Sequence, residues 1–217
     1  MKILLVSPNW TPPDALLFSK ASPLYPPLGL AYIAAYVRKH TDFEVQILDC
    51  EALNFDLDEF SNALQEKSPD IIGITALTPF VNLSLQYAEA AKEACPEVKT
   101  VLGGAHATER ADEVLEYPQI DFVVRGEGEL TFLDLVKSIG ENGQFDHIEG
   151  LSYKTNGEII HNSDREFMES LDNILLPARD ILPIEVYRGG LGSFKRLPVT
   201  TVMTSRGCPY KCTFCYK

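Results

Sequence analysis

Five short apolar runs alternate with helix-like segments over the first 141 residues, and this alternation constrains the fold more than any other feature. The runs are nearly continuous in Val, Ile and Leu, which is typical of strands covered on both faces. They are Lys2–Ser7, Glu44–Asp49, Asp70–Ala76, Lys99–Gly103 and Ile120–Arg125. Strand–helix alternation produces a parallel sheet with right-handed crossovers. We therefore expect a flavodoxin-like (Rossmann-like), doubly wound α/β fold whose five-stranded parallel sheet has the order 2-1-3-4-5.

The segments between these runs carry helical periodicity. In LSLQYAEAAKEAC, for example, Leu83, Tyr87 and Ala91 fall on one helical face. Asp56 or Asp58 can cap the helix before it. The predicted helices lie near Gly29–His40, Asp56–Lys67, Asn82–Cys95, Thr108–Tyr117 and Glu129–Glu141.

The pattern changes near Gly150. The segment LSYKTNGEIIH contains two strand-like stretches joined by Asn156-Gly157, a strong β-hairpin signal. A proline-containing stretch with little periodicity follows, and Pro198–Ser205 then resembles a single strand. We therefore divide the chain into a first domain over 1–145, a hairpin and interdomain linker over 146–197, and the start of another domain over 198–217. We expect few fixed contacts beyond about Ser205.

Composition narrows the choice of function and compartment. The net charge of −12 disfavours nucleic acid as a main partner. No apolar run approaches the ~20 residues that span a bilayer, so no transmembrane segment is expected. The N-terminal MKILLVSPNW is too short and lacks the cleavage site of a signal peptide. Three of the five cysteines are clustered, which argues against a disulfide framework and for a reducing cytoplasm.

The loops that leave the carboxyl ends of the strands are the expected ligand site of an open α/β sheet. They read SPNW, ITALTPF, LGGAHAT and RGEGE, and they are rich in glycine and threonine. Glycine lets a ligand approach the backbone and permits positive φ. No phosphate-binding glycine motif follows the first strand, so a nucleotide is disfavoured. Without further evidence, tight strand–helix turns explain the same glycines.

The last ten residues contain Cys208, Cys212 and Cys215 in the spacing C-x-x-x-C-x-x-C. Three thiolates at this spacing can hold three corners of a 4Fe-4S cluster, which is normally held by four cysteines. The fourth iron would stay open for a substrate or cofactor. A zinc knuckle is the alternative, but it needs a fourth ligand. The nearest upstream histidine, His161, lies 47 residues before Cys208.

Taken together, the chain resembles radical S-adenosylmethionine (SAM) enzymes that carry an N-terminal cobalamin-binding domain. The segments that carry the resemblance are ILLVSPN, YPPLGLAYIAAYVR, PDIIGITALT, VLGGAHAT, DFVVRGEGELTFLDLV, LPARDILP and TSRGCPYKCTFCY. Among these enzymes, the anaerobic magnesium-protoporphyrin monomethyl ester cyclases and related methylases are most similar. The resemblance implies that the three cysteines bind the cluster, that the open iron binds SAM, and that Phe214 lies near the SAM adenine.

The resemblance also implies a base-off cobalamin above the carboxyl edge of the sheet, with its nucleotide tail between the sheet and a flanking helix. The implied cobalamin-binding residues are Pro8, Asn9 and Trp10 facing the corrin, and Thr75, Leu77, Thr78, Gly103, Gly104, His106, Gly126, Glu127 and Gly128 along the tail. The D-x-H-x-x-G motif that supplies a cobalt-binding histidine in many cobalamin enzymes is absent. His106 is therefore expected to donate a hydrogen bond or to be structural rather than to bind cobalt.

The resemblance implies a longer parent enzyme, truncated here after the cysteines, that uses cobalamin, a 4Fe-4S cluster and SAM. It would transfer a methyl group to an unactivated carbon, or oxidise or cyclise there, on an unidentified small molecule such as a tetrapyrrole. A reductant of the ferredoxin or flavodoxin type would supply electrons. The 217 residues alone are expected to be inactive. The alternatives are a stand-alone cobalamin-binding module without catalysis and a flavodoxin-like regulatory domain.

Overall fold

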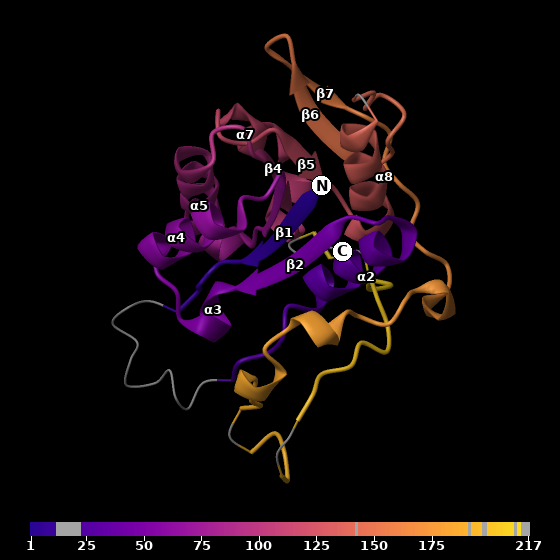
Figure 1. The fold of residues 1–217 in the computed structure, drawn as a ribbon. Coiled ribbons are helices and arrows are strands. Elements are labelled where there is room, and N and C mark those ends of the chain that lie inside the picture. Colours follow the sequence, from indigo (N-terminus) through magenta and orange to yellow (C-terminus); the bar gives the residue numbers. More distant parts are fainter. Residues whose placement is uncertain (12–22, 142, 191, 197–198, 211, 214–217) are drawn as a thin grey trace.

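The computed structural model describes residues 1–11, 23–141, 143–190, 192–196, 199–210 and 212–213. A seven-stranded sheet of order β2-β1-β3-β4-β5-β6-β7 lies at its centre (Figure 1). The strands are β1 (Lys2–Ser7), β2 (Glu44–Asp49), β3 (Ile71–Thr75), β4 (Lys99–Gly103), β5 (Phe122–Val124), β6 (Leu151–Thr155) and β7 (Glu158–His161). The first five pair in parallel, which confirms the predicted order 2-1-3-4-5.

The predicted hairpin forms and extends the same sheet. β6 pairs antiparallel with β5, and β7 pairs antiparallel with β6. Asn156 and Gly157 both have positive φ, as a two-residue hairpin turn requires. Pairing with β6 satisfies the backbone N–H and C=O groups of β5 that would be unpaired if β5 were an edge strand.

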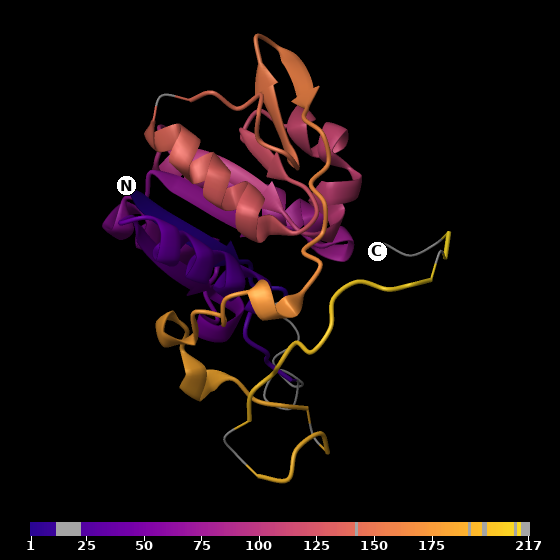
Figure 2. The same cartoon turned by 90° about the vertical axis from the view of Figure 1, so that its right-hand side faces the viewer.

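Seven α-helices are found in the described residues, and they cover both faces of the sheet (Figures 1 and 2). They are α2 (Leu28–His40), α3 (Cys50–Leu53), α4 (Leu57–Lys67), α5 (Val81–Ala94), α6 (Ala105–Glu109), α7 (Ala111–Glu116) and α8 (Gly128–Gly140). Asp56 caps α4 in a capping box with Glu59. The single helix predicted over Thr108–Tyr117 is wrong: the backbone leaves the helical region at Arg110 and separates α6 from α7.

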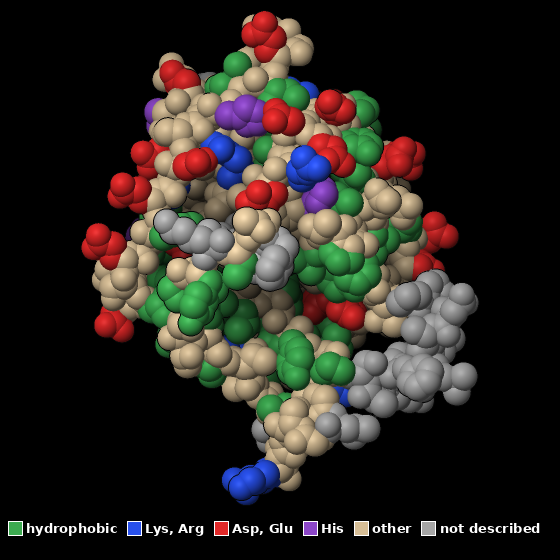
Figure 3. All heavy atoms as spheres, turned by 180° about the vertical axis from the view of Figure 1, so that it is seen from behind, with side chains coloured by type: hydrophobic (Ala, Val, Ile, Leu, Met, Phe, Trp, Pro, Cys, Tyr) green, Lys and Arg blue, Asp and Glu red, His purple; other side chains and the backbone are tan. Residues whose placement is uncertain are grey.

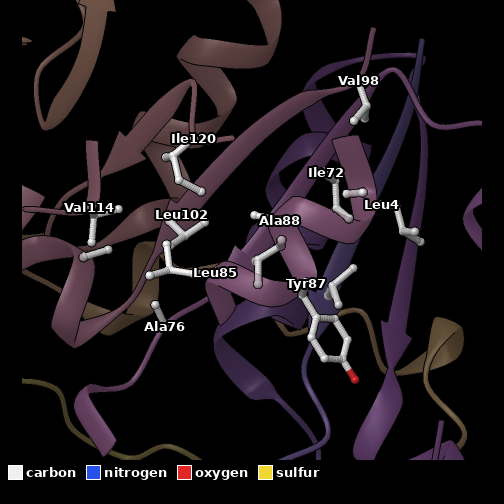
Figure 4. Packing of buried hydrophobic residues seen from close by; sticks show 14 of the residues in the cluster. Leu4, Ile72, Ala76, Leu85, Tyr87, Ala88, Val98, Leu102, Val114 and Ile120 are labelled. Atoms are coloured by element: carbon white, nitrogen blue, oxygen red, sulfur yellow. The ribbon is translucent and has the colours of Figure 1, made fainter. Parts of the chain in front are cut away.

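Two apolar clusters sandwich the sheet. α2 and α8 pack side by side on one face, over Leu5, Val101 and Val124. The other face carries α4 and α5, whose Phe60 and Tyr87 rings lie 4.5 Å apart within a cluster that also contains Ile72 and Leu102 (Figure 4). None of the described helices is long and apolar enough to cross a membrane.

Residues 163–190 run past α2 to the β2 edge of the sheet (Figure 2). They contain short 3-10 turns at Leu171–Asn173, Arg179–Ile181 and Ile184–Val186. The Tyr187 hydroxyl donates a buried hydrogen bond to Asp49 at 2.8 Å. The Ala178 amide donates to the Ala31 carbonyl in α2. These contacts tie the segment to β2 and α2.

The strand predicted over Pro198–Ser205 is absent from its described residues, 199–205. A strand requires a neighbour that satisfies its backbone groups, and no described segment pairs with these residues. Arg179 holds this stretch instead, donating to the Thr200 hydroxyl at 2.9 Å and to the Thr201 carbonyl.

Candidate functional site

A cavity of about 1120 Å³ opens at the carboxyl edge of the parallel strands. Figure 3 views the face to which this edge belongs and shows it hollowed at the middle, with hydrophobic side chains around the hollow. The cavity continues inward between the sheet and the α2–α8 pair. Its inner walls are formed by Leu5, Gly73, Val101 and Val124 from the strands and by Ile33 and Phe132 from the helices.

Gly73, in the middle of β3, lies on the wall of this cavity. A Cβ atom at Gly73 would lie 2.8 Å from Leu5 Cδ2 and 3.3 Å from Phe132 Cε2. The missing side chain therefore lets Leu5 and Phe132 pack closely against the backbone of β3. Sequence analysis treated Gly73 only as part of an apolar run, although a glycine inside a strand often marks a close approach.

Gly104 acts differently. Its φ is +100°, and a Cβ there would lie 2.9 Å from the Ala76 carbonyl oxygen. Glycine is therefore required for the turn and for the close approach of the loop after β4 to the loop after β3. A side chain at Gly104 would collide with backbone.

The structure brings most of the predicted cofactor-binding residues to this cavity. Those that line it are Trp10, Thr75, Leu77, Gly103, Gly104, Gly126, Glu127 and Gly128. Pro8, Asn9, Thr78 and His106 are not part of its lining. Asn9 instead donates from its side chain to the Phe55 carbonyl at 3.2 Å, which fixes the loop after β1.

His106 is buried behind the loops, with 7% of its surface exposed. Its Nδ1 lies 3.3 Å from the Thr78 hydroxyl oxygen. Its Nε2 is buried without a hydrogen-bond partner among the described residues. Because His106 does not reach the cavity wall, this arrangement disfavours it as a metal ligand.

An aromatic and apolar group surrounds the mouth of the cavity. Trp10 packs on Phe80 with ring centroids 5.1 Å apart. Tyr25, Leu77 and Phe167 are 49%, 41% and 67% exposed, and they line the same mouth. Exposed apolar surface of this extent beside a cavity indicates a binding surface.

A charged cluster formed by Glu127, Glu129 and Arg206 lies in the cavity wall where α8 begins. Arg206 Nη2 is 2.6 Å from Glu129 Oε1, and Arg206 Nη1 is 3.4 Å from Glu127 Oε1. Burial alone would lower the pKa of the Arg206 guanidinium, but Glu129 and Glu127 together raise it. Sequence analysis placed Glu129 only at the start of a predicted helix and missed Arg206, whose partners lie more than 70 residues away.

The predicted cluster ligands are only partly within the described residues. Cys208 lies on the cavity wall, and Cys212 is exposed. Cys215 and Phe214 lie outside the described residues, and no group of three metal-binding side chains is found in the rest. The expectation that contacts end near Ser205 is wrong at Arg206, because two carboxylates hold it.

His161 is not placed to complete a zinc site with these cysteines. Its Nδ1 lies 2.8 Å from the Ser152 hydroxyl oxygen, and its Nε2 lies 2.7 Å from Asp112 Oδ1. Both ring nitrogens are thus engaged where β7 meets β6 and α7. Ser152 is fully buried, so these three side chains offer no accessible nucleophile either.

Comparison with known proteins identifies the family of the chain. The sequence model of the B12 binding domain matches residues 15–136. An uncharacterized methyltransferase of Pyrococcus horikoshii is 39% identical over 216 residues, which cover 99% of this chain and 45% of that protein. The anaerobic magnesium-protoporphyrin IX monomethyl ester cyclase of Rubrivivax gelatinosus is 32% identical over 99% of this chain and 38% of its own length. The chain thus spans less than half the length of either relative.

Solved structures support the fold. The cobalamin-dependent S-adenosylmethionine radical enzyme OxsB, solved with aqua-cobalamin and S-adenosylmethionine bound, superposes with a TM-score of 0.65. The superposition covers 85% of this chain and 25% of OxsB, at 23% identity. At this identity the likeness shows the shared fold alone.

Proposed function

The chain belongs to the B12-binding domain family, and we propose that it holds cobalamin at the carboxyl edge of its sheet, within a cobalamin-dependent radical SAM enzyme. The cavity carries this proposal, because its lining joins apolar side chains at the carboxyl edge, such as Trp10 and Leu77, to residues of the strands and of α2 and α8 deeper in the fold. A flat macrocycle with a long nucleotide tail needs that combination. Small-molecule sites of α/β sheets are expected at this edge.

The lining residues suit the two parts of cobalamin. Trp10 and Leu77 present apolar surface at the mouth, where the corrin would lie. Gly73 lies on the wall of the inner part of the cavity, where the nucleotide tail would lie. Thr75 adds a hydroxyl between these parts, and Gly103 and Gly126 allow close backbone approach. Pro8, Asn9, Thr78 and His106 would support the loops from behind.

Cobalamin, when bound, supplies a cobalt centre that carries a methyl group or assists a redox step, and the chain's own residues position it. No cobalt-binding imidazole is proposed, because His106 is held behind the loops and is not part of the cavity lining. The lower face of the corrin would then be covered by protein or water.

Residues 206–215, called the cysteine segment below, are proposed to hold the 4Fe-4S cluster through Cys208, Cys212 and Cys215, with SAM on the open iron. The position of Cys208 on the wall of the same cavity supports this, since it places one thiol beside the proposed cobalamin site. The reaction proposed for the whole enzyme is methyl transfer to, or oxidation or cyclisation at, an unactivated carbon of a small molecule. A reductant of the ferredoxin or flavodoxin type is proposed as a further partner. The division into 1–145, 146–197 and 198–217 is also kept as a proposal.

Titration with hydroxocobalamin tests the proposal. We expect the purified chain to change the visible spectrum of the cofactor and to retain it through gel filtration at micromolar concentration. Loss of all retention at high micromolar concentration would contradict the proposal. Hydroxocobinamide, which lacks the nucleotide, is the matched probe. We expect weaker retention of it, because it leaves the inner extension of the cavity empty.

A further inference from the structure

We propose that Arg206 is a positioning residue that ties the cysteine segment to the start of α8 and so sets where Cys208 lies over the cavity. The contacts of Arg206 with α8 are observed within this chain. The role proposed for them, holding the cysteine segment at a defined place beside the cofactor, rests on the proposed function.

The first observation is that Arg206 joins two segments that are distant in sequence. Its two terminal nitrogens engage Glu127 and Glu129, which lie 79 and 77 residues earlier. Tyr32, from α2, lies beneath the guanidinium with its ring centroid 4.9 Å from Arg206 Cζ. The Arg206 side chain thus contacts α2 and the start of α8, the two helices that line the cavity.

The second observation is the burial of this charged cluster. The side chains of Glu129, Arg206 and Glu127 are only 5%, 16% and 19% exposed. Paired charges that are shielded from water interact more strongly than exposed pairs, and removal of one partner leaves an uncompensated charge. No other cation pairs with either carboxylate among the described residues.

The third observation is that Glu127 also holds a second segment. Its Oε2 accepts a hydrogen bond from the Met168 amide at 2.9 Å, while its Oε1 faces Arg206. Met168 belongs to the segment that leaves the sheet after β7, and it also lines the cavity. Glu127 therefore holds together the start of α8, the segment after the hairpin and the cysteine segment.

Chain geometry then gives the consequence for the cysteines. Cys208 is two residues from Arg206, so at most about 7 Å of backbone separates the two Cα atoms. Fixing the guanidinium therefore confines the thiol to the cavity mouth. Lysine would keep the charge at Arg206 but not the planar fork that engages two carboxylates at once.

Distance measurement between two spin labels tests the tie without any cofactor. One nitroxide is placed on Cys208 and the other on Glu89→Cys, at an exposed position of α5. Cys95, Cys212 and Cys215 are changed to Ser, while the buried Cys50 is left in place. We expect a narrow distance distribution in this background.

Variants of the charged cluster should change that distribution. We expect Arg206→Met to at least double its width and Arg206→Lys to give an intermediate width. The double change Glu127→Gln with Glu129→Gln removes the charges at nearly constant shape, and we expect it to broaden the distribution as well. The control is Arg38→Met, which removes an exposed ion pair with Asp180 and should leave the width unchanged.

The midpoint of urea unfolding separates positioning from general loss of fold. We expect the midpoint of Arg206→Lys to stay close to that of the parent while the distribution broadens. An unchanged width in Arg206→Met, or in the double Gln variant if Arg206→Met does not fold, would overturn the proposal. Hydroxocobalamin titration of the unlabelled proteins is read separately. Failure of every protein to bind, the parent included, refutes the proposed function and leaves the tie to be decided by the distance data.

Discussion

Replacing Gly73 by Val should block the inner part of the cavity while the fold persists. The backbone conformation of Gly73 does not require glycine, because its φ is not positive. A Cβ there would meet Leu5 Cδ2 at 2.8 Å and Phe132 Cε2 at 3.3 Å. Both contacts are with side chains, and the nearer one is the flexible end of a leucine. The valine would therefore be accommodated by displacing the Leu5 and Phe132 side chains, which line the cavity.

Two opposing effects set the cost to stability. Overpacking a core costs about 1–3 kcal/mol, whereas removing a glycine from a strand interior regains about 0.5–1 kcal/mol. The net loss in the free energy of unfolding should be roughly 0–2.5 kcal/mol. The cost to binding is separate. The valine side chain adds three carbon atoms to the cavity wall. If each removes the equivalent of one buried CH₂ from the contact between cofactor and protein, at about 0.8 kcal/mol per CH₂, the binding free energy weakens by about 2.4 kcal/mol, or roughly 50-fold in affinity.

Hydroxocobalamin titration of Gly73→Val, read beside urea unfolding, measures both effects. The matched control is Ile72→Val, on the same strand but on the face covered by α4 and α5. It should cost about 0.5–1.5 kcal/mol of stability and leave the affinity unchanged. If Gly73→Val folds and binds hydroxocobalamin within threefold of the unmodified chain, the assignment of the inner extension to the nucleotide tail is refuted.

Three other predictions follow from buried groups. Bound cob(II)alamin should give cobalt EPR lines without nitrogen triplet splitting, because His106 does not reach the cavity; a triplet that disappears in His106→Ala would contradict this. Iodoacetamide at pH 8 should modify Cys208 and Cys212, which are exposed, but not Cys50, because burial raises the pKa of the Cys50 thiol to about 12; rapid labelling of Cys50 in the folded chain would be the opposing result. Burial also raises the pKa of Asp49, so the folded chain binds more protons than the unfolded chain. The free energy of unfolding should therefore fall relative to Asp49→Asn as the pH rises from about 4; a difference that stays flat in urea titrations from pH 4 to 7 would contradict the burial argument.

The sheet could be predicted well because its signals are local. β1, β2 and β4 have the bounds that their apolar runs predicted, since each run is nearly continuous and ends in polar or glycine residues. Asn156-Gly157 predicted the hairpin because few other residue pairs adopt positive φ at two successive positions. The break at Arg110 had no such signal, because neither proline nor glycine marks it.

The site could be predicted only in part. The resemblance to cobalamin-dependent radical SAM enzymes named eight of the residues that line the cavity. They lie in or next to the loops after β1, β3, β4 and β5, which parallel topology brings together. The pairing of Arg206 with Glu129 spans 77 residues and leaves no periodic pattern. Gly73 lay within a run that predicted a strand correctly, so its second effect, the close approach of Leu5 and Phe132 to the strand, required the packing to be known.

The cavity is walled by segments that lie far apart in the sequence, and this has a consequence for biosynthesis. Leu5 and Trp10 form part of its lining, and residues 203 and 205–209 form another part. A ribosome delivers the N-terminal sheet first, and domains fold as units while the rest is still emerging. The sheet and the helices that cover it can therefore assemble before the last wall is available. We expect a nascent chain that ends near residue 160 to be folded but to bind hydroxocobalamin weakly, and full retention to require the segment that contains Arg206. Cofactor loading would then report that synthesis has passed the junction between the proposed cobalamin site and the proposed cluster site.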